Sequence, residues 1–298
     1  MHMSVAGIVR IFLHYSSEEQ AGNTKNTTRG GETMSIQAKF LSSIEEYIRP
    51  LTYPVAVKLL KDGEDFPAKT RFPAEFAKER WALCQGIAMS RRVGWKVGFR
   101  REDHACILAM MIFGLESEPQ TVKDGEIVYP YYAQSPEAGR RTQEATPSLP
   151  LDAFSGVVTA PLAKADFDAD VVLVYGNAAQ VIRLVQGALY HGGGKIDSSF
   201  TGRGACGSEI VVPYQTGQCK VIIPGGGERV FAHTADDELL FAVPACELAN
   251  VAAGVEATHK SGIARIPTPF MGMRCKPDFP EKYTDVAKQF GIVDEEGV

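Results

Sequence analysis

The stretch Asp170-Val-Val-Leu-Val-Tyr175 decides the fold, together with the run at 178–190 that follows it. Its apolar residues would face both sides of a strand, which is typical of a strand in the middle of a sheet that helices cover. In the run at 178–190 the apolar residues recur with the spacing of one helix face, so it predicts a helix. A buried strand that leads directly into such a helix indicates an α/β fold.

The same order of elements occurs twice along the chain. Each copy has a strand, a helix, a second strand and then a cysteine that begins a helix: 54–60, 80–92, 96–99 and Cys106 in the first, and 170–175, 178–190, 195–196 and Cys206 in the second. The strands that follow the cysteines, at 157–161 and 240–244, are also alike. Similarity in a fixed order indicates a repeated structural unit. We expect two similar α/β halves related by a pseudo-twofold axis, with mixed sheets covered by helices. The alternative is that two unrelated α/β stretches have the same order of strands and helices.

The repeat sets the expected domain boundaries. They are a first α/β half at 34–150, a second α/β half at 151–275 and a tail with a short helix at 276–298. Residues 1–33 begin with an apolar run that Arg10 interrupts and continue as a polar stretch, which fits a secretory signal poorly. We interpret them as a disordered leader, or as the product of a start codon assigned too early, with Met34 as the true first residue.

The rest of the chain contains further predicted elements. We expect helices at 35–49, 135–144 and 246–259 and a strand at 219–223. Residues 116–150 are the least regular part and are predicted to form a lid or a connection between the halves.

The composition excludes several classes of protein. With 298 residues, of which 45% are hydrophobic, the chain can bury a sizeable core. No apolar run approaches the roughly 20 residues that span a bilayer. A net charge of -5 without a basic stripe disfavours a nucleic-acid partner. We expect a cytoplasmic protein whose six cysteines are reduced thiols or metal ligands. Its partner is a small molecule, and an exposed edge strand in each half would allow a homodimer.

Cys106 and Cys206 are the first candidates for a functional site. A thiol at a helix N-terminus lies near unpaired backbone N–H groups, which favour the thiolate, and a thiolate is both a nucleophile and a metal ligand. If the halves pack face to face, the two thiols converge, so we predict them to be catalytic. Cys84 and His104 lie close enough in the pattern to complete a ligand set for one metal or an iron–sulfur cluster. The alternative is that each cysteine packs as a small apolar side chain.

Glycine-rich turns are the second candidate. Gly202-Arg-Gly-Ala-Cys-Gly207 matches the letters of a dinucleotide-binding fingerprint, but Pro213 ends the following helix too early for that fold. The turn still offers backbone N–H groups beside Cys206 that suit an anion or cluster sulfides. We predict Gly202, Gly204 and Arg229 as cofactor-binding residues, with tight turning alone as the alternative role of the glycines.

These motifs together resemble the DUF169 family. The resemblance rests on the run at 160–174, Gly176-Asn177, Gln180, Cys206 and the run at 212–217, and further on Cys84-Gln85, Glu102-Asp103 and Arg229. It covers roughly 36–291. The family contains cysteine-rich proteins of bacteria and archaea, many from anaerobes, of unassigned activity, and its cysteine pattern implies a metal or iron–sulfur site. Family members often carry cysteine in the turn before the arginine, whereas this chain has Pro224-Gly-Gly-Gly-Glu-Arg229.

The sequence therefore supports one main hypothesis and two alternatives. The first is a cytoplasmic metalloprotein that holds an iron–sulfur cluster or another metal cofactor through cysteines at the interface of two repeats, with a position open for a small substrate. The second is a metal-free binding or accessory protein that takes a small anionic ligand through Gly204, Cys206 and Arg229. The third is an enzyme that uses the thiolate of Cys106 or Cys206 as nucleophile. Whether the protein is an enzyme stays open.

Overall fold

The computed structural model describes residues 34–262 and 281–291. Its centre is one sheet with the strand order β2-β3-β1-β4-β6-β5, in which every pair of neighbours is antiparallel. The strands are β1 (Val55–Lys61), β2 (Val97–Arg100), β3 (Phe154–Pro161), β4 (Val171–Gly176), β5 (Lys220–Ile222) and β6 (Leu239–Pro244). The mixed α/β architecture is thus confirmed. The expected mixed sheets are not confirmed, because all strand pairs of this sheet are antiparallel.

The longer helices lie close to their predicted positions. Within the described residues the helices are α2 (Ile36–Ser43), which continues as a π-helical turn at Ile44–Ile48, α3 (Pro73–Phe76), α4 (Leu83–Val93), α5 (Ile107–Ile112), α6 (Gln120–Lys123), α7 (Pro136–Glu144), α8 (Ala178–Leu189), α9 (Val212–Thr216), α10 (Gly226–Ala232), α11 (Leu248–Lys260) and α12 (Glu281–Gln289). The predicted helices at 35–49, 80–92, 135–144, 178–190 and 246–259 are confirmed with small shifts at their ends. The strand predicted at 195–196 is not formed, whereas the strand predicted at 219–223 is present as β5. The predicted leader at 1–33 lies outside the described residues, as do 276–280 and 292–298 of the tail.

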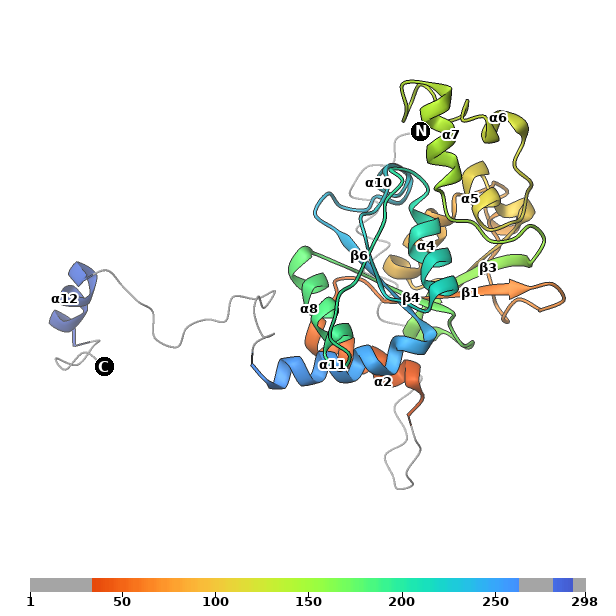
Figure 1. The fold of residues 1–298 in the computed structure, drawn as a ribbon. Helices are drawn as coiled ribbons and strands as arrows, with labels where there is room; N and C mark the ends of the chain where they lie inside the picture. Colours follow the sequence, from red (N-terminus) through yellow and green to blue (C-terminus); the bar gives the residue numbers. More distant parts are fainter. Residues whose placement is uncertain (1–33, 263–280, 292–298) are drawn as a thin grey trace. The chain divides into compact units, whose positions relative to one another are not determined.

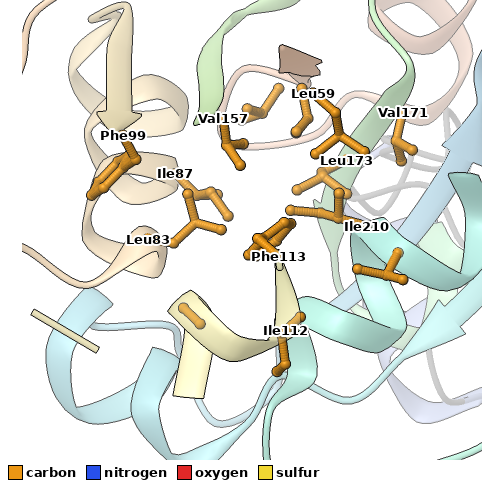
Figure 2. Close-up of a cluster of buried hydrophobic side chains, with 14 of the residues drawn as sticks. Leu59, Leu83, Ile87, Phe99, Ile112, Phe113, Val157, Val171, Leu173 and Ile210 are labelled. Atoms are coloured by element: carbon orange, nitrogen blue, oxygen red, sulfur yellow. The ribbon is translucent and has the colours of Figure 1, made fainter. Parts of the chain in front are cut away.

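Both faces of the sheet are covered, because successive side chains of a strand point to opposite sides. On one face the apolar side chains of β1 and β4 pack with α4 and with Phe113 and Ile210. Figure 2 shows Leu83, Ile87 and Leu173 gathered around Phe113. On the other face, alternate residues of the same strands pack with α2, α8 and α11, and α11 contacts both α2 and α8 (Figure 1).

The close packing of α8 against α11 depends on two glycines. A Cβ atom added to Gly254 would lie 1.9 Å from the carbonyl oxygen of Gly187, and one added to Gly187 would lie 2.5 Å from a methyl of Val255. Only hydrogen atoms fit at this crossing, so the two backbones can approach closely.

The predicted pseudo-twofold relation between two halves is not confirmed. The strand order is symmetric about the β1–β4 pair, but α4 and α8, which follow these strands in the two copies, cover opposite faces. A twofold axis that exchanges two antiparallel neighbours runs perpendicular to the sheet and would leave both helices on one face. The second half also contributes β3, which lies between β2 and β1 of the first.

None of the helices within 34–262 and 281–291 combines the length and the apolar character needed to cross a membrane.

Candidate functional site

Three of the predicted cysteines line a single cavity of about 250 Å³, which we call the thiol pocket. Cys84, Cys106 and Cys206 reach it from three separate parts of the chain, and the carboxyl groups of Glu209 and Glu228 share its wall. The other lining residues are Ala82, Leu83, Leu108, Ala109, Ile127, Tyr132, Gly202, Arg203, Gly204, Ala205, Gly225, Gly226, Gly227 and Phe231. Gly202 and Gly204, predicted from the sequence, are therefore part of the same pocket.

Backbone hydrogen bonds bring Cys84 and Cys106 together. The N–H of Trp81 donates to the carbonyl of Asp103 at 2.9 Å, and the N–H of Ala105 donates back to the carbonyl of Trp81 at 2.8 Å. These bonds hold the chain just before α4 beside the chain just before α5. Cys84 lies in the first turn of α4, and Cys106 directly precedes α5, so both thiols reach the pocket.

Cys206 reaches the pocket from a third part of the chain. It directly precedes the π-helical turn Gly207–Val211, and Ala205 beside it packs against the glycine turn before α10. A Cβ atom on Gly225 would lie 3.3 Å from the Cβ of Ala205, so glycine allows this close approach. The Cys84 thiol donates to the carbonyl oxygen of Gly227 at 3.9 Å. This bond links α4 to the start of α10 across the pocket lining.

The two carboxyl groups are bound differently. Glu228 accepts a hydrogen bond from the N–H of Gly225 at 2.7 Å and one from the hydroxyl of Tyr175 at 3.0 Å. Glu209 is 1% exposed, and its Oε2 has no hydrogen-bond partner within the described residues. Burial raises the pKa of both groups, and for Glu209 the nearby Glu228 raises it further.

Arg91, whose charge acts on both of these acids, is already engaged elsewhere. Arg91 is buried, lies over the ring of Tyr175 at 3.9 Å from its centroid, and binds Glu238 through two hydrogen bonds of 2.6 and 3.0 Å. Its charge lowers the pKa of Glu209 and Glu228, but burial outweighs this effect. The pocket therefore contains more acidic groups than basic ones.

Cys84 and Cys206 are not activated as nucleophiles. Burial, followed by Glu228 and Glu209, raises the pKa of Cys84 to about 12. Burial also raises the pKa of Cys206 well above its ordinary value, and Glu209 and Cys106 add to this. The field of a helix terminus contributes about 1 kcal/mol or less at most sites, which burial among acids outweighs.

The other predicted site residues lie outside the pocket. His104 is 1% exposed, its ring centroid lies 5.1 Å from that of Phe99, and burial lowers its pKa to about 4. Arg229 donates to the carbonyl of Ala235 at 2.5 Å and pairs with Asp236 at 3.8 Å.

The remaining cysteines are also elsewhere. Cys219 is buried in the core on the α8 and α11 face, and Cys246 is exposed. Cys275 lies outside the described residues.

Sequence reasoning missed Glu209 and Glu228. Glu209 is an acid within the otherwise apolar run that follows Cys206, and Glu228 directly precedes Arg229. The sequence did contain one sign of Glu209, which is a charged residue within an apolar run. Charged groups are rarely buried without a role or a partner, so such a residue is a candidate for a functional site.

The ligand groups do not already surround a single point. In residues 34–262 and 281–291, no three or more His, Cys, Asp or Glu side chains are placed so that they could hold one metal ion. The predicted set of Cys84, His104, Cys106 and Cys206 is therefore not assembled as a site for one ion.

The comparison with known proteins covers the part of the chain that contains the thiol pocket. The sequence profile of the DUF169 family, described as "Uncharacterised ArCR", matches residues 43–254, which include all three cysteines and both acids of the thiol pocket. A similar protein is "Uncharacterized protein MJ0308" of Methanocaldococcus jannaschii, which is 27% identical over 207 residues, or 68% of this chain and 86% of the relative. No solved structure matches this chain.

Proposed function

The chain belongs to the DUF169 family, and we propose that it is a metalloprotein whose thiol pocket holds an iron–sulfur cluster, or another cofactor with several metal ions, through Cys84, Cys106 and Cys206. The observation that carries the proposal is that these three thiols line one cavity although they come from three parts of the chain. Three protein ligands leave a position for a small substrate, as in catalytic metal sites. When bound, such a cofactor supplies electron transfer or Lewis-acid chemistry.

The chemistry of the donor groups supports a cation. Thiolates are the ligands that iron–sulfur clusters and soft metals prefer, and carboxylates bind iron and zinc as well. Glu209 has a buried oxygen with no partner within the described residues, and its pKa, like those of Cys84 and Cys206, is raised by burial among acids. A bound cation reverses this effect, since it stabilises the deprotonated form of each ligand. We therefore expect cofactor binding to release protons.

The spread of the ligands favours a cluster over a single ion. One zinc ion needs all its ligands within about 2.0–2.3 Å of one point. The cysteines of a cluster bind different iron atoms, so they lie farther apart. Thiols that share a cavity without surrounding one point fit the second case better.

The two alternatives have less support. A free thiolate nucleophile is disfavoured at Cys206, because burial raises its pKa. A small anion held by Gly204, Cys206 and Arg229 is disfavoured because Arg229 pairs with Asp236 and does not line the pocket.

We also propose a cytoplasmic location, with a homodimer as a possible assembly. Support for the location is that Cys84, Cys106, Cys206, Cys219 and Cys246 are all free thiols, which persist in a reducing compartment. A dimer has less support. The two edges of the sheet are β2 and β5, but the N–H of Gly98 in β2 donates to the carbonyl of Arg71 and the N–H of Val221 in β5 donates to the hydroxyl of Ser198. Light scattering after size exclusion measures the oligomeric state.

Anaerobic purification tests the proposal, with a visible absorption spectrum and analysis of iron, zinc and sulfide. We expect a coloured protein, and we expect Cys206→Ser to lose most of the bound metal because it removes a ligand. Cys246→Ser is the matched control, since that cysteine is exposed and lies outside the pocket. A colourless wild-type protein with less than about one metal per chain, even after reconstitution with iron and sulfide, would refute the proposal. Equal metal content in the two variants would remove Cys206 from the ligand set.

A further inference from the structure

A second cavity, of about 310 Å³, adjoins the thiol pocket. The two share part of their walls at Gly202, Arg203, Ala205, Gly225 and Gly226. The character of the second cavity differs from that of the thiol pocket. Among the described residues that line it there is no acidic side chain.

Apolar and hydroxyl side chains form the rest of this second cavity. Phe200, Ile222 and Ile223 supply an apolar wall, and Thr201 and Ser208 supply hydroxyl groups. Phe200 and Ile223 are each about half exposed, at 51% and 54%, so a ligand could cover apolar surface there.

Arg203 lies in the wall common to both cavities and is partly buried. Its Nη1 atom is buried and has no hydrogen-bond partner, and the guanidinium forms no ion pair within the part of the chain that the structure describes. By contrast, Arg91 pairs with Glu238 and Arg100 with Asp103. A guanidinium stays charged even where burial lowers its pKa, and leaving a buried donor unpaired is costly.

We propose that the second cavity binds a small aliphatic carboxylate, with Arg203 bound to the carboxylate and the carbon chain packed against Phe200 and Ile222. Arginine matches the two oxygens of a carboxylate with parallel hydrogen bonds. The apolar wall favours a carbon chain over inorganic phosphate, which needs donors on every side. Among the described residues that line this cavity, Arg203 is the one cation, and there is no His, Cys, Asp or Glu side chain. This composition also suits a ligand with one negative charge.

The position of Arg203 defines a substrate class for the proposed cofactor. A carboxylate held in the shared wall lies beside the thiol pocket, so the ligand of one cavity would reach the cofactor in the other. This assignment as substrate rests on the proposed function, whereas the binding of the carboxylate does not.

Ligand-observed NMR and calorimetry with butyrate test the inference on the protein as purified. Butyramide, a neutral analogue of nearly the same shape, and inorganic phosphate are the comparison probes. We expect wild type to bind butyrate in preference to both. Arg203→Met should weaken butyrate binding by about tenfold or more, because it removes charge-assisted hydrogen bonds. Arg203→Lys keeps the charge but loses the two parallel N–H donors of the guanidinium, so it should weaken butyrate binding less.

Arg141→Met is the matched control, since Arg141 is exposed on α7 and pairs with Glu137. Thermal melting checks that each variant is folded, and Arg203→Lys carries the test if Arg203→Met does not fold. Any of three results would overturn the inference: the wild type does not bind butyrate, it prefers phosphate or butyramide, or the folded Arg203 variants bind butyrate within about twofold of the wild type. Metal content is measured in parallel. Butyrate binding without bound metal refutes only the proposed function, and bound metal without butyrate binding refutes only this inference.

Discussion

The buried carboxyl of Glu209 should make the metal-free protein less stable as the pH rises, and Glu209→Gln should remove much of this loss. Burial, and then the nearby Glu228, raise the pKa of Glu209 well above its ordinary value of 4.5. In the unfolded chain the same carboxyl is in water, where its pKa is close to that value. Between the two values the folded state keeps a proton that the unfolded state has released. The free energy of unfolding therefore falls as the pH rises through this window.

The size of the effect follows from this difference in bound protons. One such group lowers the free energy of unfolding by about 1.4 kcal/mol per pH unit within the window. Within this window the wild type should lose about 1.4 kcal/mol more per pH unit than Glu209→Gln, whose amide keeps the shape but carries no titrating proton. Because Glu209 and Glu228 titrate as a pair, the slope belongs to the pair, and the substitution removes one of its two protons.

Urea unfolding of chelator-treated protein at several pH values measures these slopes. Glu126→Gln is the matched control, because Glu126 is exposed and lies outside the thiol pocket. We expect its slope to equal that of the wild type. If Glu209→Gln loses stability with pH as steeply as the wild type, the carboxyl is ionised in the folded protein and the reasoning about its burial is wrong.

Two further substitutions test the packing that supports the site. Gly254→Ala places a Cβ 1.9 Å from the carbonyl oxygen of Gly187. We therefore expect the free energy of unfolding, measured in urea, to fall by about 1–3 kcal/mol. Gly192→Ala is the control, because an added Cβ there has nothing within 4 Å, and equal stability of the two variants would contradict the close crossing of α8 and α11. Arg91→Met leaves Glu238 without its bidentate partner, although Glu238 is partly exposed and still lies 3.6 Å from Arg92. We expect the free energy of unfolding to fall by about 1.5–3 kcal/mol at neutral pH, and a loss below about 1 kcal/mol would show that the pair is not important for stability.

Local structure was largely predictable because its causes are local. The helix at 178–190 and the strand at 170–175 were readable from hydrophobic spacing, since side chains that share a face recur with the period of the element. The direction of the strands was not readable. A strand that is apolar on both faces is consistent with any sheet that helices cover on both sides, whether its strands are parallel or antiparallel.

The pocket was predictable only in part. Cys106 and Cys206 were recognised from their residue type and their position at helix starts. Cys84 was recognised from its residue type and its closeness to Cys106 in the pattern of elements, and all three line the pocket. His104 is two residues from Cys106, but it packs against Phe99 in the core, because closeness in sequence does not set which way a side chain points. Glu209 and Glu228 belong to the pocket through contacts between distant segments, and these have no local pattern.

Residue chemistry and local spacing alone established the α/β class, the positions of the main elements and the three thiols. Folding decided that the strands form one antiparallel sheet, that α4 and α8 lie on opposite faces, and that the thiols share a cavity with two acids and Arg203. It also decided that Cys84 and Cys206 are protonated thiols in the absence of a cation. The reason is physical: a side chain brings its own groups to a site, but its pKa, its partners and its access to solvent depend on what distant parts of the chain place around it.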